Sequence, residues 1–351
     1  MVLCSNDYLG LAGSAALTDA VVRGAMEHGA GAGASRHISG TAPAHVAAER
    51  SLAAYVRLPS AILFATGYAA NIGAIQALAG PGDAVFSDAL NHASIIDGCR
   101  LSRASVFVYP HGDVAALEHL LAAHRRESRL ALVVTESLFS MDGDRAPLEA
   151  LASACRNHDA GLFVDEAHAL GVCGPEGRGL CAEANVAPDV LVGTLGKALG
   201  LAGAFVAGPP TSVRLVENKA RSFIFSTAPS PAIAAAIPTA VDIARRSDPA
   251  RARLRSHAAK LRDGLGKLGY RLVPSDGPII PVHVGSASAA MALSNALLEH
   301  GVFVHGIRPP TVPDGTSRLR VTPMATHEDR DIEGALSAFE STREMYDEIS
   351  H

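Results

Sequence analysis

The sequence contains no tryptophan, few cysteines and no apolar run long enough to cross a membrane. A membrane helix needs about 18 or more consecutive apolar residues, so no membrane span is expected. The N-terminus lacks the basic and apolar regions of a secretory signal. The five cysteines are odd in number and form no Cys-x-x-Cys pair, which argues against a regular disulfide framework. We therefore expect reduced thiols and a cytoplasmic location.

Charge is sparse as well. Charged residues make up 19% of the chain, the net charge is −5, and no dense basic stripe marks a nucleic-acid surface. No His-Glu-x-x-His motif occurs, and we expect no metal site. Lysine is found only at positions 197, 219, 260 and 267. Because arginine supplies nearly all the positive charge, a lysine in an apolar, glycine-rich setting suggests a chemical role.

The first two thirds of the chain have the pattern of an α/β domain. Short apolar runs predict strands at 61–66, 84–87, 105–109, 130–135, 161–165, 190–194 and 204–207. Helical patterns between them cover 69–79, 93–102, 114–125 and 148–158. Strands that are apolar throughout are typical of parallel strands covered on both faces. We predict a large domain over 1–230 with a mostly parallel central sheet, including a short N-terminal segment, 1–30.

The pattern changes after residue 230. Helices are predicted at 231–246, 249–268, 287–300 and 328–341, with short strands at 279–284, 301–305 and 318–322. No low-complexity linker separates this region from the first. It predicts a smaller C-terminal α+β domain over 231–351.

The strongest local signal is residues 192–200, Val-Gly-Thr-Leu-Gly-Lys-Ala-Leu-Gly. Lys197 is flanked by glycines after an apolar strand, so it can approach a planar ligand closely. Apolar neighbours favour its neutral, nucleophilic amine. An ordinary loop lysine at a strand end is the alternative, and this segment alone does not separate the two.

Residues 162–168, Leu-Phe-Val-Asp-Glu-Ala-His, bring Asp165 to the C-terminal end of a strand, where open α/β sheets bind ligands. A carboxylate there can keep a ring nitrogen protonated, and His168 can bond a ring hydroxyl; alternatively, Asp165 caps the next segment. The Asp-Glu-Ala-His tetrad also resembles the magnesium motif of helicase-type NTPases. Those proteins need an upstream phosphate loop, whereas here the Gly-Lys pair lies downstream and Ala198 stands where Ser or Thr is required.

Three further segments carry weaker signals. Residues 65–71, Ala-Thr-Gly-Tyr-Ala-Ala-Asn, join a strand to a helix whose first amides can bind a phosphate. His92 follows a strand and can lie flat on a ring or simply begin a helix. Residues 306–313, Gly-Ile-Arg-Pro-Pro-Thr-Val-Pro, precede Arg318-Leu319-Arg320. They can form a rigid fork for a carboxylate or a structural proline turn with surface arginines.

Together these segments resemble the α-oxoamine synthase family, fold-type I pyridoxal-phosphate (PLP) enzymes that condense amino acids with acyl-CoA thioesters. The resemblance begins at residues 5–10, Ser-Asn-Asp-Tyr-Leu-Gly, and runs nearly to the C-terminus. It includes residues 136–144, Glu-Ser-Leu-Phe-Ser-Met-Asp-Gly-Asp, and 225–227, Phe-Ser-Thr. Residues 307–313 look most like members that join L-alanine to a pimeloyl thioester, on CoA or an acyl carrier protein, in biotin biosynthesis. Members that use glycine with acetyl-CoA, or that make 5-aminolevulinate, are the alternatives.

The resemblance implies roles at the cofactor. Lys197 would bind PLP covalently, Asp165 would pair with the pyridine nitrogen and His92 would stack on the ring. His168 and Ser140 would contact the ring hydroxyl region. The phosphate would be bound by residues at three places in the chain, namely the backbone amides of Gly67 and Tyr68, Thr194, and Thr227 from the neighbouring subunit. The last of these implies a homodimer with active sites at the subunit interface.

The resemblance also implies a set of substrate-binding residues, namely Asn6, His92, Arg308, Thr311 and Arg320. Arg320 would hold the carboxylate of the amino acid, helped by Arg308 and Asn6. Family members usually carry a helical segment before the Asn-Asp-Tyr-Leu-Gly motif, which here begins at Asn6. That segment normally helps to cover the acyl entry.

Overall fold

The computed structural model describes residues 1–349. The chain forms two compact units. The large unit comprises Leu11–Leu138 and Ala146–Ser247, and the small unit comprises Met1–Gly10, Phe139–Arg145 and the chain from Asp248 onward. The division thus falls after Ser247, not at the predicted residue 230, because the helix that begins at Pro231 packs against two N-terminal helices of the large unit.

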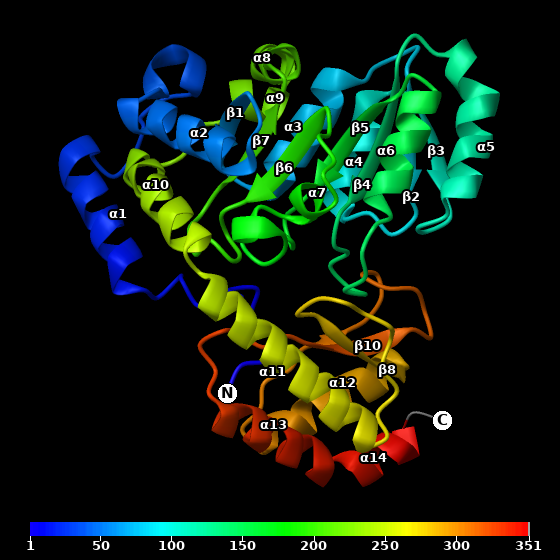
Figure 1. Cartoon of the computed structure of the whole chain (residues 1–351). Coiled ribbons are helices and arrows are strands. Elements are labelled where there is room, and N and C mark those ends of the chain that lie inside the picture. Colours follow the sequence, from blue (N-terminus) through cyan, green and yellow to red (C-terminus); the bar gives the residue numbers. More distant parts are fainter. Residues whose placement is uncertain (350–351) are drawn as a thin grey trace. The chain divides into compact units, whose positions relative to one another are not determined.

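A seven-stranded sheet forms the centre of the large unit (Figure 1). Its order is β1 (Ser60–Phe64), β7 (Ala204–Gly208), β6 (Val190–Thr194), β5 (Gly161–Asp165), β4 (Ala131–Glu136), β2 (Ala84–Asp88) and β3 (Ser105–Tyr109). Strand β7 is antiparallel to both neighbours, and the other pairs are parallel. The predicted α/β fold with a mostly parallel sheet is therefore confirmed.

Helices surround this sheet: α1 (Ala15–His28), α2 (Pro43–Val56), α3 (Gly67–Leu78), α4 (Ala93–Ser102), α5 (Val114–His124), α6 (Leu148–Asn157), α7 (Leu180–Glu183), α8 (Pro210–Lys219), α9 (Arg221–Ile224) and α10 (Pro231–Arg245). Helices α1 and α10 lie side by side (Figure 1). Gly24 permits this close approach, since a Cβ added to it would lie only 2.7 Å from the carbonyl oxygen of Ala232. The segment predicted as 1–30 therefore contains a docked helix.

Small residues also bring α3 against α4. A Cβ added to Gly98 of α4 would lie 3.0 Å from Ile75 and 3.2 Å from the carbonyl oxygen of Asn71. Helix α3 also buries Ala70, Ala74 and Ile75 in a cluster that includes strand residues of the sheet. This tight packing brings polar side chains of α3 and α4 within hydrogen-bond distance of each other.

The small unit contains an antiparallel sheet in the order β8 (Ile280–Gly285), β10 (Ser317–Val321) and β9 (Gly306–Ile307). Its helices are α11 (Asp248–Lys267), α12 (Ala287–Glu299), α13 (Asp329–Ser341) and α14 (Arg343–Ile349). Leucines of α11 and α12 and Phe339 of α13 join β8 and β10 in one apolar core. The predicted α+β character is therefore present in this unit.

The predicted strand at 301–305 is wrong. Buried and exposed side chains do alternate in this segment, since Val302 and Val304 are buried while Phe303 is exposed. The segment nevertheless pairs with the N-terminus through an isolated parallel bridge between Val2 and Phe303, and the third strand of the sheet is the shorter β9. Within residues 1–349 no helix is both long and apolar enough to cross a membrane.

Candidate functional site

The predicted cofactor residues of the large unit gather where its parallel strands end. Asp165 is the last residue of β5, Thr194 is the last residue of β6, and Lys197 lies in the turn that follows. Glu136 ends β4 and is the register partner of Asp165. Because neighbouring parallel strands end at the same edge of a sheet, these side chains share one region, as expected for a ligand site in an open α/β fold.

Asp165 is a buried carboxylate held by neutral donors. It is 6% exposed. Its Oδ1 accepts the N–H of Ala167 at 2.8 Å, and its Oδ2 accepts Nδ2 of Asn71 at 2.7 Å. These bonds fix the orientation of the carboxylate without neutralising its charge. Such a group can pair with a cationic ring nitrogen.

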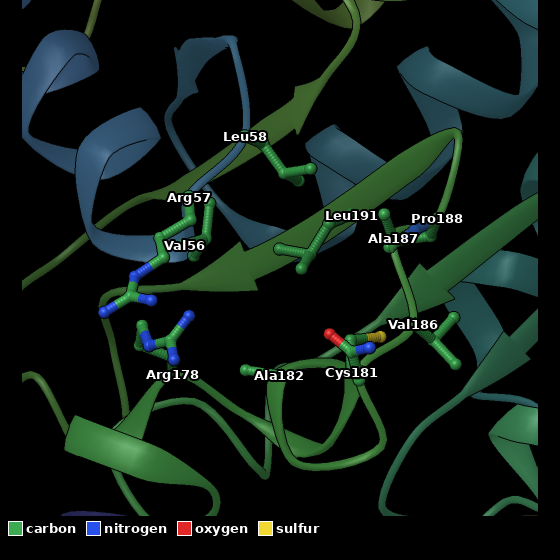
Figure 2. Close-up of a pocket in the computed structure, with 11 residues that line it drawn as sticks. Val56, Arg57, Leu58, Arg178, Cys181, Ala182, Val186, Ala187, Pro188 and Leu191 are labelled. Atoms are coloured by element: carbon green, nitrogen blue, oxygen red, sulfur yellow. The ribbon is translucent and has the colours of Figure 1, made fainter.

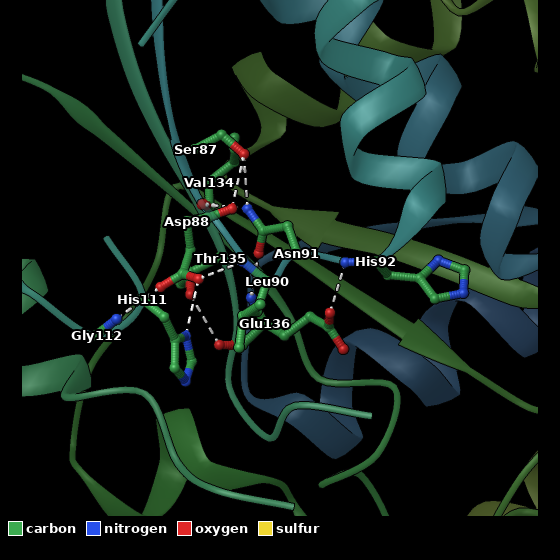
Figure 3. Close-up of polar contacts among 10 residues, drawn as sticks. All are labelled: Ser87, Asp88, Leu90, Asn91, His92, His111, Gly112, Val134, Thr135 and Glu136. Atoms are coloured by element: carbon green, nitrogen blue, oxygen red, sulfur yellow. Dashed lines mark hydrogen bonds and ion pairs between the residues drawn. The ribbon is translucent and has the colours of Figure 1, made fainter. Parts of the chain in front are cut away.

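His92 caps α4 and is anchored through its backbone. Its N–H donates to Oε1 of Glu136 at 2.7 Å, while its imidazole ring extends away from that carboxylate (Figure 3). The preceding Asn91 donates to Ser87 Oγ and to the carbonyl oxygen of Val134, each at 2.9 Å. These bonds tie the segment after β2 to β4 and place His92 close to Asp165 and Lys197.

Two groups in this cluster have shifted pKa values. Burial, followed by the charge of Asp165, raises the pKa of Glu136 to about 8, although Lys197 opposes the shift. Burial lowers the pKa of His92, with Asp165 opposing and Lys197 reinforcing the effect. Lys197 is therefore close enough to act on both groups. At neutral pH Glu136 is mainly protonated and His92 is mainly neutral.

The raised pKa of Glu136 predicts a pH-dependent stability. Between about pH 4.5 and pH 8 the folded protein holds a proton on this side chain that the unfolded chain lacks. Stability therefore falls as the pH rises through this window. Relative to Glu136→Gln, the free energy of unfolding of the cofactor-free protein should fall by up to about 1.4 kcal/mol per pH unit. Urea titrations at several pH values between 4.5 and 8 measure this free energy of unfolding for both proteins.

Glu118→Gln, an exposed change on α5, is the matched control and should leave the pH dependence as in the unmodified chain. Identical pH profiles for the unmodified chain and Glu136→Gln would contradict a protonated Glu136.

The start of α3 offers an open, amide-lined position. Thr66 caps the helix by accepting the N–H of Ala69 at 3.1 Å. The earlier amides, of Gly67 and Tyr68, belong to the first turn, where N–H groups have no intrahelical acceptor. A Cβ added to Gly67 would meet only Thr194 Oγ1, at 4.0 Å. The helix start and the end of β6 therefore lie together with room for an anion between them.

Glu166, the residue after Asp165, is buried and accepts a different set of donors. Its carboxylate accepts Ser137 Oγ at 2.8 Å and the N–H of Leu180 at 3.0 Å. A Cβ added to Gly179, whose φ is +95°, would lie 2.5 Å from Glu166 Oε2. The segment before α7 is therefore held against Glu166, which is next in the chain to Asp165, the predicted cofactor residue. His168, also predicted, is 5% exposed.

In the small unit a cluster forms around Arg320, which is 5% exposed. Its Nε donates to the carbonyl oxygen of Ser140 at 2.6 Å, and its Nη1 donates to Asn6 Oδ1 at 3.0 Å. Thr322 Oγ1 and the Tyr8 hydroxyl accept two longer bonds. All four partners are neutral, so within residues 1–349 no carboxylate of the protein pairs with this guanidinium. A buried, uncompensated cation suits an anionic ligand.

The other arginines of the predicted fork differ. Arg318 forms an ion pair with Asp142, so its charge is already balanced. Arg308 is exposed and contacts Met291 Sδ and the carbonyl oxygen of Gly306. Thr311 is also exposed. Of the predicted substrate residues in this unit, the structure brings together Asn6 and Arg320, with Ser140 beside them, but not Arg308 or Thr311.

A separate cavity of about 230 Å³ lies at the opposite end of β6 (Figure 2). Val56 ends α2 and Leu58 follows it, while Pro188 and Leu191 lie just before and within β6; these apolar side chains line the cavity together with Arg57, Arg178 and Asn185. Lys197 follows the other end of the same strand. This cavity contains no predicted site residue.

Comparison with known proteins assigns the chain to a family. The family model for aminotransferase class I and II matches residues 1–339. The chain belongs to this family. It is 51% identical over 342 residues to an 8-amino-7-oxononanoate synthase from Geobacter sulfurreducens. The matched region covers 96% of this chain and 87% of the relative.

Two solved structures have the same fold. A serine palmitoyltransferase from S. paucimobilis with a bound PLP–myriocin aldimine superposes with a TM-score of 0.95 at 33% identity, covering 99% of this chain and 88% of that one. An 8-amino-7-oxononanoate synthase from Francisella tularensis gives a TM-score of 0.85 at 27% identity and covers 99% of both chains. The predicted fold-type I architecture is confirmed.

Sequence reasoning assigned no role to three residues of the site: Glu136, Asn71 and Ser94. Asn71 and Ser94 stand out in the sequence only as polar residues within apolar helical patterns. Their contacts join segments far apart in the chain; Asn71 and Asp165 are separated by 94 positions. Such pairings become visible only in the folded chain.

Proposed function

We propose that this chain catalyses the decarboxylative condensation of L-alanine with a pimeloyl thioester to form 8-amino-7-oxononanoate. In this reaction a bond forms between the α-carbon of alanine and the acyl carbonyl carbon. The carbon–sulfur bond breaks and releases a thiol, and the carboxylate of alanine leaves as CO₂. The observation that carries the proposal is the 51% identity, along nearly the whole chain, to a protein of that name.

The cofactor is pyridoxal 5′-phosphate, the group named with the serine palmitoyltransferase structures. When bound, it supplies an electron sink for the bond that breaks at the α-carbon. The residues present fit this group. Asp165 offers a buried anionic charge to a ring nitrogen, and the side-chain-free position of Gly67 beside Thr194 leaves room for a phosphate.

Each predicted residue then has a physical task. The Lys197 amine binds the cofactor and takes the α-proton of the amino acid. Asp165 keeps the ring nitrogen protonated, because a nearby negative charge favours the cationic form. His92 would lie against the ring. The ring hydroxyl and the phosphate would be contacted by the remaining predicted residues, namely His168, Ser140, Gly67, Tyr68, Thr194 and, from the neighbouring subunit, Thr227.

Arg320 is proposed to bind the carboxylate of alanine. Its partners Asn6 and the Ser140 carbonyl hold the guanidinium in place without cancelling its charge. A planar guanidinium can bind a carboxylate through two parallel hydrogen bonds. Arg308 and Thr311, which are both exposed, are also proposed to contact the substrate.

We also propose that the chain acts as a homodimer in the cytoplasm. Thr227 is exposed, and its backbone bridges to Ser35. The apolar side chains of Phe225 and Ile38, which lie within three residues of Thr227 and Ser35 respectively, are 70% and 80% exposed. Apolar groups exposed together beside a predicted phosphate contact are typical of a subunit interface. The odd number of cysteines, without a Cys-x-x-Cys pair, agrees with a reducing compartment.

A thiol-release assay tests the function. Alanine, glycine and serine are each paired with pimeloyl, acetyl and palmitoyl thioesters, on CoA and on an acyl carrier protein. Alanine with the pimeloyl thioester should give the highest kcat/KM, about 10-fold or more above glycine, since one methyl group in a fitted pocket has at least that effect. A preference for serine with palmitoyl thioester would overturn the proposal in favour of the activity named for the structural relatives.

A further inference from the structure

Asn71 is a polar residue buried inside α3. It is 1% exposed. Its Nδ2 donates to Oδ2 of Asp165 at 2.7 Å and to Oγ of Ser94 at 2.9 Å. Both amide hydrogens are therefore used, one on the carboxylate that ends β5 and one on a hydroxyl of α4.

The other half of this amide explains its orientation. Oδ1 of Asn71 is buried and has no hydrogen-bond partner in the described part of the chain. Leaving a buried acceptor unsatisfied costs stability. The flipped amide would direct its oxygen at the carboxylate of Asp165 and lose that bond. The observed orientation thus leaves one oxygen without a hydrogen-bond partner and directs two N–H groups at Asp165 and Ser94.

The next contact continues from Ser94 to His92. Because Ser94 Oγ accepts from Asn71, its own hydrogen is left to donate, and Nδ1 of His92 lies 2.8 Å away. The backbone N–H of Ser94 also points at this nitrogen, at 3.2 Å. With two donors converging on it, Nδ1 must be an acceptor. The ring is then neutral and carries its hydrogen on Nε2.

We propose that Asn71 and Ser94 are positioning residues that connect Asp165 to His92. Asn71 fixes one carboxylate oxygen of Asp165, and Ser94 holds His92 as the neutral tautomer with hydrogen on Nε2. The inference rests on the proposed roles of Asp165 and His92 at the cofactor. A neutral ring can lie beside Lys197 without repelling its ammonium group and without competing with a cationic ligand for Asp165.

The charged and titratable groups that face His92 are consistent with this role. Asp165 and Lys197 act on it with opposite signs, and its own burial disfavours the cation. Glu136 binds the backbone N–H of His92 rather than the ring. The hydrogen bonds from Ser94 therefore decide which ring nitrogen carries the hydrogen.

Histidine side-chain ¹⁵N spectra of the cofactor-free protein test the relay, with His92 assigned by its loss in His92→Asn. In the unmodified chain His92 should show the neutral pattern with hydrogen on Nε2. Ser94→Ala removes the hydroxyl donor, so His92 should shift toward the other tautomer or protonate at a higher pH. Ser102→Ala removes a buried hydroxyl of the same helix that bonds the carbonyl oxygen of Cys99, and it should leave the His92 signals unchanged.

His92 signals in Ser94→Ala that match the unmodified chain would overturn the relay. If Ser94→Ala does not fold, Ser94→Cys, with a weaker donor of similar size, should shift His92 in the same direction, and no shift there would equally overturn it. Asn71→Ala should also weaken binding of pyridoxal phosphate about 10-fold, as loss of a supporting partner does at other sites. Unmodified protein that fails to bind pyridoxal phosphate would refute the proposed function but leave the His92 result standing.

Discussion

Lys197→Ala should abolish condensation, lowering kcat by at least about 10³-fold, because the variant loses the amine that both attaches the cofactor and moves the α-proton. Lys197 lies in the turn after β6, close enough to His92 and Glu136 to affect the pKa of both. The Lys197 side chain is only half-buried and belongs to no apolar core cluster of the described residues, so circular dichroism should show an unchanged fold. Steady-state thiol release measures the loss.

Lys219→Ala is the matched control, since Lys219 is exposed at the end of α8. It should retain full activity. Borohydride reduction followed by mass spectrometry provides a second measurement. Cofactor should become covalently attached to the unmodified chain and to Lys219→Ala, but not to Lys197→Ala. Retained turnover in Lys197→Ala would remove the basis of the assignment.

Asp165→Asn should lower kcat by about 10²-fold or more, in the range seen when one electrostatic group of an active site is lost. Asparagine has nearly the same shape but only one acceptor oxygen, so it can accept the N–H of Ala167 or that of Asn71, but not both. It also loses the negative charge that is proposed to keep a ring nitrogen protonated. Substrate binding depends on other groups, so KM should change much less than kcat.

The control for this change is Asp189→Asn. Asp189 precedes β6, at the end of the strand away from Lys197, and accepts the N–H of Leu162 at 2.8 Å. The same loss of charge there should leave kcat within about twofold. Equal activity of Asp165→Asn and the unmodified chain would contradict the role of Asp165.

The strands of the large unit were predictable because burial on both faces leaves a plain apolar run. The ranges 161–165 and 190–194 agree with the buried strands β5 and β6 to the residue, and 105–109 agrees with β3, although that edge strand is largely exposed. Helices α1 and α2 were not predicted. Their stability comes from close packing on α10, which is a tertiary property.

The same distinction applies to the site. Asp165, Thr194 and Lys197 could be predicted because a strand end and a following glycine turn are local features. The small-unit cluster depends instead on pairing between positions at opposite ends of the chain, such as Asn6 and Arg320. Arg318 and Arg320 look alike in the sequence, yet only Arg318 has an acidic partner. Only the folded chain shows which of the two retains an unbalanced charge.

Gly179 limits how freely this enzyme can be redesigned. Any side chain placed there meets the carboxylate of Glu166, and the backbone at φ +95° is itself unfavourable for other residues. A library of mutants selected for new acyl donors should therefore recover glycine at this position almost without exception. Variation there would be transmitted through one peptide unit to Asp165, the residue proposed to pair with the cofactor's ring nitrogen.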